Sequence, residues 1–152
     1  MGGELRALER APAFYIQANK DPRSAHLDRI QVVKGWLEEG GSREQVFDVV
    51  WSGERELDSS GALAPVTDTV DPRTGRYSND YGAATLAALW RDPQFDPAQR
   101  AFYYVRVLEV PTPRHSTLDA IAMGIPVEET GQPVSIQERA YTSPINYFPP
   151  ES

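Results

Sequence analysis

The segment Ala101–Val110 constrains the fold most strongly, because its ten residues contain almost no polar side chain. Side chains alternate between the two faces of a strand, so this run would be apolar on both faces. A strand with two apolar faces must be covered on both sides, and we therefore predict a central strand that ends at Pro111 and Pro113. One face would carry Phe102, Tyr104, Leu108 and Val110, and the other Ala101, Tyr103, Val105 and Val107.

A β-hairpin is predicted upstream of this strand. Residues 27–37 and 45–52 each alternate apolar and polar side chains, and the loop between them contains Gly40 and Gly41. Two alternating runs joined by a short glycine-containing loop are typical of a hairpin. Residues 13–18 show the same period of two and predict a further strand that ends at an Asp-Pro turn.

The middle of the chain is less regular. Residues 53–75 are rich in turn-forming residues and predict a long excursion, with a short strand at 66–70. The alanines and leucines of residues 83–90 favour a helix by propensity, but so short a helix is marginal, and we expect a strand that ends at Trp90. Two Asp-Pro pairs make residues 92–97 a loop.

The last third predicts one helix and one irregular strand. Ser116 or Thr117 is expected to cap a short helix near residues 116–123, which Gly124 would end. Residues 135–148 alternate loosely, and Pro144 would confine this strand to a sheet edge or split it. These elements predict a mainly all-β fold, an antiparallel immunoglobulin-like β-sandwich with long loops, in which residues 13–149 form a single domain after an N-terminal arm, residues 1–12.

Composition narrows the classes of function. The 152 residues include 15 basic and 22 acidic side chains, and the resulting net charge of −7 argues against nucleic acid or an anionic membrane as the main partner. No apolar run approaches the roughly 20 residues of a membrane-spanning helix. The chain has no cysteine and two histidines, so it lacks a thiolate nucleophile and cannot assemble a histidine-rich metal centre by itself.

Three segments resemble a known family. They are residues 19–36, which contain Asn-Lys-Asp-Pro and Leu-Asp-Arg-Ile-Gln-Val-Val-Lys-Gly-Trp, then Tyr103–Arg114, and finally Ile136–Ile145. Together they are similar to the C-terminal region of the large bacterial family called domain of unknown function 3604, and the similarity extends from Met1 to Pro149. Members are much longer, and their preceding region resembles the metal-dependent phosphoesterase domain of the polymerase and histidinol phosphatase type.

This resemblance implies that the chain is a non-catalytic C-terminal accessory module of a metal-dependent, phosphoesterase-like hydrolase. Its partner would be the catalytic domain of its own parent chain, any divalent metal would be bound only in that domain, and Met1 would be an internal methionine or a fragment boundary. Family members often resemble exported proteins, which implies a periplasmic or extracytoplasmic location. The family pattern usually has tryptophan where this chain has His115 and Asn146, and the paired loss suggests two rings that touch or share a surface.

The polar residues on and after the central strand are the candidates for substrate or interface binding. One interpretation directs their guanidinium groups at a phosphate or sulfate of the parent's substrate. The favoured interpretation is a structural ion-pair network, or a docking contact, because buried charges are usually paired for structural reasons. His115 has no partnering histidine nearby and is expected to be a surface or packing residue rather than a general base. The candidates are Arg106, Glu109, Thr112, Arg114, His115, Glu138 and Arg139, and no catalytic or metal-binding residue is predicted.

Two alternatives stay open from sequence. Asp80, Asp92 and Asp96 lack the regular spacing of a calcium loop and are better explained as turn residues. A stand-alone ligand- or carbohydrate-binding sandwich would display an exposed row of aromatic rings, whereas the aromatic residues of a small sandwich mostly lie in its core. Tyr103 or Tyr104 is expected to hold a crossover loop through its hydroxyl. The aromatic candidates for a sugar platform are Trp36, Trp51, Trp90, Tyr77, Tyr81 and Tyr147.

Overall fold

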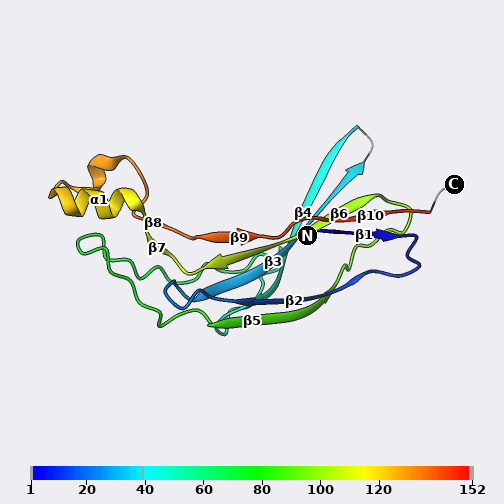
Figure 1. Cartoon of the computed structure of the whole chain (residues 1–152), viewed down its shortest axis with the longest axis horizontal. Helices are drawn as coiled ribbons and strands as arrows, with labels where there is room; N and C mark the ends of the chain where they lie inside the picture. Colours follow the sequence, from blue (N-terminus) through cyan, green and yellow to red (C-terminus); the bar gives the residue numbers. More distant parts are fainter. Residues whose placement is uncertain (1, 39, 151–152) are drawn as a thin grey trace.

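The computed structural model describes residues 2–38 and 40–150, which form two β-layers and a small helical lobe (Figure 1). Within these residues the larger sheet has six strands, and the second layer is a two-stranded sheet. The mainly all-β, sandwich-like class and its single short α-helix are confirmed. The larger sheet has the order β1 (Gly3–Arg6), β10 (Ile145–Phe148), β6 (Ala101–Glu109), β3 (Leu27–Glu38), β4 (Gly41–Trp51), with β9 (Arg139–Tyr141) also paired to β6. The second sheet consists of β2 (Ala13–Asn19) and β5 (Thr85–Arg91).

Strand β6 lies at the centre of the larger sheet, as its apolar sequence predicts. It pairs antiparallel with β3 on one side and with β9 and β10 on the other. Its inner face, represented by Ala101 and Tyr103, is buried against the second sheet. Its outer face is covered only in part, since the Phe102 side chain remains 39% exposed. The expectation of cover on both faces is therefore met on one side only.

The hairpin β3–β4 is confirmed, with Glu38 paired to Gly41 at its tip. Strand β5 is also confirmed, although its alanines and leucines favour a helix. The partner strand β2 decides its conformation, because Ala13–Asn19 pairs with β5 over its whole length. The two layers enclose a core to which Ile16, Leu86 and the central strands contribute.

The loop between β5 and β6 is held by two tyrosine hydroxyls. Tyr103 donates to an oxygen of Asp92 at 2.7 Å, which fulfils the expected loop-tying role of this tyrosine. Tyr147 is fully buried and donates to the backbone oxygen of Pro97 at 2.7 Å. Phe95 in the same loop packs edge-on against the Tyr147 ring.

The helical lobe projects from the sheets on the short ladder formed by β7 (Thr112–Pro113) and β8 (Ser135–Ile136) (Figure 1). It contains α1 (His115–Met123) and the 3-10 helix η1 (Val127–Thr130). Gly124 ends α1 with a left-handed φ of 69°, as expected. The N-cap is Arg114 rather than Ser116 or Thr117, and the Thr117 hydroxyl instead donates to the backbone oxygen of Val134.

Three further differences from the sequence predictions concern strands. Residues 66–70 form no strand, since no neighbouring segment of the described chain pairs with them. Residues 3–6 of the expected arm form β1, which pairs parallel with β10. Pro144 splits the last segment into β9 and β10, one of the two outcomes expected for it. Among the described residues, no helix is long and apolar enough to span a membrane.

Candidate functional site

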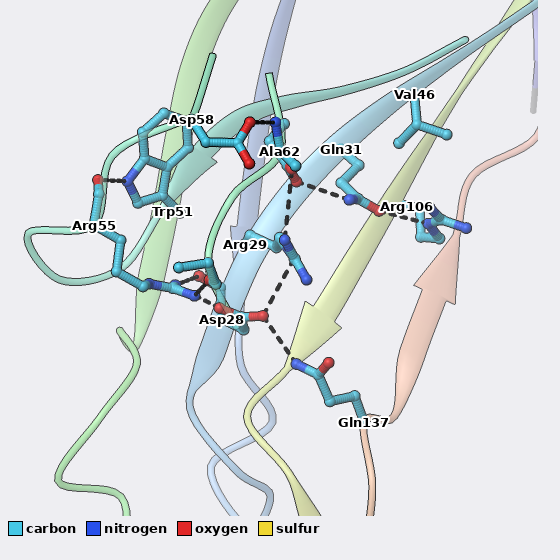
Figure 2. Close-up of polar contacts among 12 residues, drawn as sticks. Asp28, Arg29, Gln31, Val46, Trp51, Arg55, Asp58, Ala62, Arg106 and Gln137 are labelled. Atoms are coloured by element: carbon cyan, nitrogen blue, oxygen red, sulfur yellow. Dashed lines mark hydrogen bonds and ion pairs between the residues drawn. The ribbon is translucent and has the colours of Figure 1, made fainter. Parts of the chain in front are cut away.

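A polar network begins where β3 bulges at Asp28, next to its apolar stretch. The Asp28 side chain is fully buried and accepts hydrogen bonds from Arg55 Nη2 at 2.5 Å and from Gln137 Nε2 at 2.9 Å (Figure 2). Arg29 Nε lies 3.3 Å from the second Asp28 oxygen, Oδ2. Two cations and one amide therefore compensate this buried carboxylate, as a buried charge requires.

The network continues across the outer face of the larger sheet. Gln31 on β3 donates to Asp48 on β4 at 2.7 Å. It also accepts a hydrogen bond from Arg106 Nε on β6 at 2.7 Å (Figure 2). Arg29 Nη1 lies 3.5 Å from Asp48. These side chains come from three adjacent strands, so their hydrogen bonds fix the strands laterally.

A second polar cluster lies on the inner face of β3. Lys34 Nζ is 2.7 Å from Asp92 Oδ2 and donates to the backbone oxygen of Gln94 at 2.7 Å. The Tyr103 hydroxyl binds the same Asp92 oxygen. Burial, together with the hydrogen bond to Asp92, raises the pKa of Tyr103 well above its ordinary value.

The structure brings three of the sequence candidates together around a hollow of about 310 Å³. Glu109 at the end of β6 accepts a hydrogen bond from the Ser24 hydroxyl at 2.6 Å, and Glu138 and Arg139 line the same hollow. Lys20 lies beside them. Arg106 is separate, since its Nε is engaged by Gln31 on the outer face of the sheet.

The other candidates lie at the base of the helical lobe. Thr112 belongs to β7, Arg114 caps α1, and His115 is the exposed first residue of the helix. Within the part of the chain that the structure describes, no ion pair joins any two of the charged candidates, so the expected network among them is absent. His115 lies on α1 and Asn146 on β10, which are far apart (Figure 1), so two rings at these positions would not touch each other.

Aromatic rings gather on the outer face of the larger sheet. Phe102 and Tyr104 lie 6.4 Å apart with nearly parallel rings, and Tyr141 on β9 is 6.1 Å from Tyr104. Phe102 leans over Gly35, where any larger residue would overlap the ring. A hollow of about 470 Å³ next to Phe102 is lined by Gly35 and Leu37, among others. We call Phe102, Tyr104 and Tyr141 the outer aromatic row.

None of these three rings was among the sequence candidates for a sugar platform. Of its six aromatic candidates, Trp90 packs among Phe14, Phe47 and Tyr103, and Tyr147 is fully buried. Trp51 donates its indole N–H to the backbone oxygen of Arg55 at 2.6 Å. These three rings therefore support the expectation that aromatic residues of the sandwich are mainly structural.

The polar network around Asp28 and Gln31 was not predicted from the sequence either. Asp28, Gln31 and Lys34 are polar residues of a strand that is largely buried, and their place in a predicted strand was the available signal, because a polar residue buried in a strand needs a partner. Their partners Arg55, Asp92 and Gln137 are distant in sequence and carry no local signal. Among the described residues, no group of three or more His, Asp or Glu side chains is placed to hold a metal ion.

These features define a small β-sandwich module with a buried polar network and an aromatic outer face. The chain matches the family described as "Protein of unknown function (DUF3604)" over residues 1–149 and therefore belongs to it. No curated protein and no solved structure is significantly similar to the chain.

Proposed function

We propose that this chain is a non-catalytic accessory module that covers the catalytic domain of a longer, metal-dependent hydrolase of the phosphoesterase type. The proposal places the chain in the C-terminal region of that hydrolase, in the periplasm or outside the cell. Its family membership and the resemblance of residues 19–36, 103–114 and 136–145 to the C-terminal region of longer members support this role.

The outer aromatic row is the observation that carries the proposal. Large side chains of two adjacent strands lie on a face that the second layer does not cover, and Tyr141 is 55% exposed. The neighbouring hollow extends this apolar surface to Leu37, which is also exposed. Contiguous apolar patches with aromatic residues at their centre are typical of protein–protein interfaces.

The test mixes this chain with the separately produced catalytic region of a longer family member. We expect a stable complex, and we expect Phe102→Asp to weaken it at least tenfold, because a charge would be buried at the centre of the interface. Leu89→Asp is the matched control, since Leu89 is also apolar and exposed, at 69% against 39% for Phe102, but lies on β5. Equal losses with both variants, or no complex, would contradict the proposal.

A second measurement addresses the non-catalytic part of the proposal. The isolated chain is assayed against aryl phosphate and aryl sulfate esters with added manganese, zinc or iron. We expect no turnover above the metal-only background. Reproducible metal-dependent turnover by this chain alone would overturn the accessory role.

The same outer aromatic row favours one alternative, a stand-alone carbohydrate-binding module. Nearly parallel rings spaced 6.4 Å apart on a sheet face, as in Phe102 and Tyr104, provide apolar surfaces on which sugar rings can pack. A calorimetric screen of simple glycans separates the two functions. Saturable heat that disappears in Tyr104→Ala would favour the sugar-binding function, whereas the accessory module should give none.

A further inference from the structure

One edge of β2 has no partner strand among the described residues. Strand β5 pairs with one side of β2, and β5 in turn lies next to β4, so the other side of β2 faces away. Lys20 N–H donates to Ala84 oxygen in register with the ladder. Hydrogen-bonded and non-bonded pairs alternate in an antiparallel ladder. The backbone N–H and C=O groups of Tyr15 and Gln17 therefore point to the unpartnered edge, while those of Ile16 point to β5.

An elongated trough runs along this edge. Its first half, about 560 Å³, is lined by residues 14–17 of β2, by Val105 of β6 and by residues 141–143. Its second half is the hollow of about 310 Å³ already described, lined by residues 18–21, Val107 and residues 138–140. The inner face of β6 forms the floor, and β9 with the residues after it forms the far wall.

The trough exists because the second layer is narrower than the first. Two strands cover a six-stranded sheet, so the inner-facing Val105 and Val107 of the central strand remain half-buried. Natural edge strands are usually protected by proline, by an inward-pointing charge or by a bulge. Residues 13–19 contain none of these features.

We propose that the trough accepts one extended segment of a partner polypeptide, which pairs with the unpartnered edge of β2 and becomes the third strand of the second sheet. Side chains at alternate positions of the segment would cover Val105 and Val107. Its backbone would form hydrogen bonds with the N–H and C=O groups of Tyr15 and Gln17. Residues 138–143 line the side of the trough opposite β2, so the segment would lie between β2 and β9.

Charge specifies the segment further. Five charged side chains line the second half of the trough, three of them carboxylates, and Lys20 is already bound to three backbone oxygens. Glu138 is exposed, and Glu109 is half-buried. A segment that alternates apolar and polar residues and has a basic residue at the end beside Glu109 and Glu138 would complement the trough.

The probe is an acetylated, amidated peptide of sequence Lys-Val-Thr-Val-Thr-Val-Gly, added at millimolar concentration to the full chain. The readout is hydrogen exchange of individual β2 amides measured by NMR. We expect the Tyr15 and Gln17 amides to exchange rapidly in the free chain and at least tenfold more slowly with peptide. The Ile16 amide, already bonded to β5, should remain slow throughout.

Two controls make the test decisive. Gln17→Pro removes one unpartnered backbone N–H and leaves the hydrogen bonds between β2 and β5 intact. The variant should therefore keep its thermal stability but no longer bind the peptide. Peptides N-methylated at alternate positions give a control that needs no protein variant: one alternating set should abolish binding and the other should leave it intact.

Weak binding of a free peptide is overcome by fusing it through a Gly-Ser linker to the N-terminus, since Gly2 lines the trough. Unchanged exchange of Tyr15 and Gln17 in this fusion, or slow exchange already in the free chain, would overturn the proposal. The accessory function can fail independently, because Phe102→Asp on the outer face should leave peptide binding unaltered.

Discussion

Two buried carboxylates lie on opposite faces of the larger sheet, and the cations that compensate them differ in their exposure to solvent. The side chains of Asp28 and Asp92 are both 0% exposed. The cations beside Asp28, Arg29 and Arg55, keep 15% and 16% of their side-chain surface in solvent. The cation beside Asp92, Lys34, keeps 3%.

The difference decides what happens when the carboxylate is removed. Arg55 also donates to the backbone oxygens of Ser52 and Ala64, and solvent reaches it, so it would remain largely satisfied without Asp28. Lys34 would retain one hydrogen bond, to Gln94 oxygen, in a site closed to water. A buried charge without its counter-ion is among the most costly defects in a protein interior. The inner cluster should therefore be the more sensitive of the two.

The largest effect is expected for Asp92→Ala. We expect a loss of about 3–5 kcal/mol in the free energy of unfolding, because the variant leaves the Lys34 ammonium buried and unpaired. Urea denaturation at neutral pH measures the loss. Adding Lys34→Met to Asp92→Ala should recover much of it, since the orphaned charge is then gone; failure to recover would show that lost packing, not charge, causes the defect.

A smaller effect is expected for Asp28→Ala, about 2–3 kcal/mol, because hydrogen bonds to a charged group are lost while the arginines keep other acceptors or solvent. Gln137 Nε2 would keep only its bond to Glu109 oxygen. Amide exchange in β9, which follows Gln137, should therefore accelerate in Asp28→Ala and in Gln137→Ala alike. If Asp28→Ala proves more costly than Asp92→Ala, the comparison based on partner burial is wrong.

The fold could be predicted from sequence where the pattern is local. Alternation located the hairpin, the nearly continuous apolar run of residues 101–110 located the central strand, and the glycine at position 124 located the end of α1. Strand β1 was missed because its four residues are mostly polar and its partner β10 lies at the other end of the chain. Residues 66–70 have strand-like composition, but without a pairing partner they stay irregular.

The candidate site was harder to predict, because its contacts are long-range. Residues 28, 31 and 34 were identified only as members of a strand. The bulge beside Asp28 changes the register, so alternation alone does not say what each side chain meets. The partners of Asp28 come from residues 55 and 137, on loops whose course no periodicity specifies. Arg106 was one of the candidates for an ion-pair network, and its partner is the amide oxygen of Gln31 rather than a carboxylate.

The last and smallest expected effect uses pH to distinguish the two clusters. An exposed tyrosine has a pKa of about 10, and burial beside Asp92 raises the pKa of Tyr103 in the folded chain. Above pH of about 10, the unfolded chain therefore loses this proton while the folded chain keeps it. The unfolded state then binds fewer protons, so stability falls as the pH rises, by at most about 1.4 kcal/mol per pH unit.

Tyr103→Phe should remove this pH dependence. At neutral pH the variant should have a lower free energy of unfolding than the unsubstituted chain, because the hydrogen bond to Asp92 is lost. Urea denaturation should show that this difference becomes smaller between pH 9 and 11. Tyr15→Phe, at a tyrosine that is 70% exposed, is the matched control and should follow the unsubstituted chain. Asp28→Ala should also show the pH dependence of the unsubstituted chain, because no tyrosine is hydrogen-bonded to Asp28 within the described residues. A deficit of Tyr103→Phe that stays constant over this range would mean that the inner cluster admits solvent, and the greater sensitivity assigned to Asp92 would lose its physical basis.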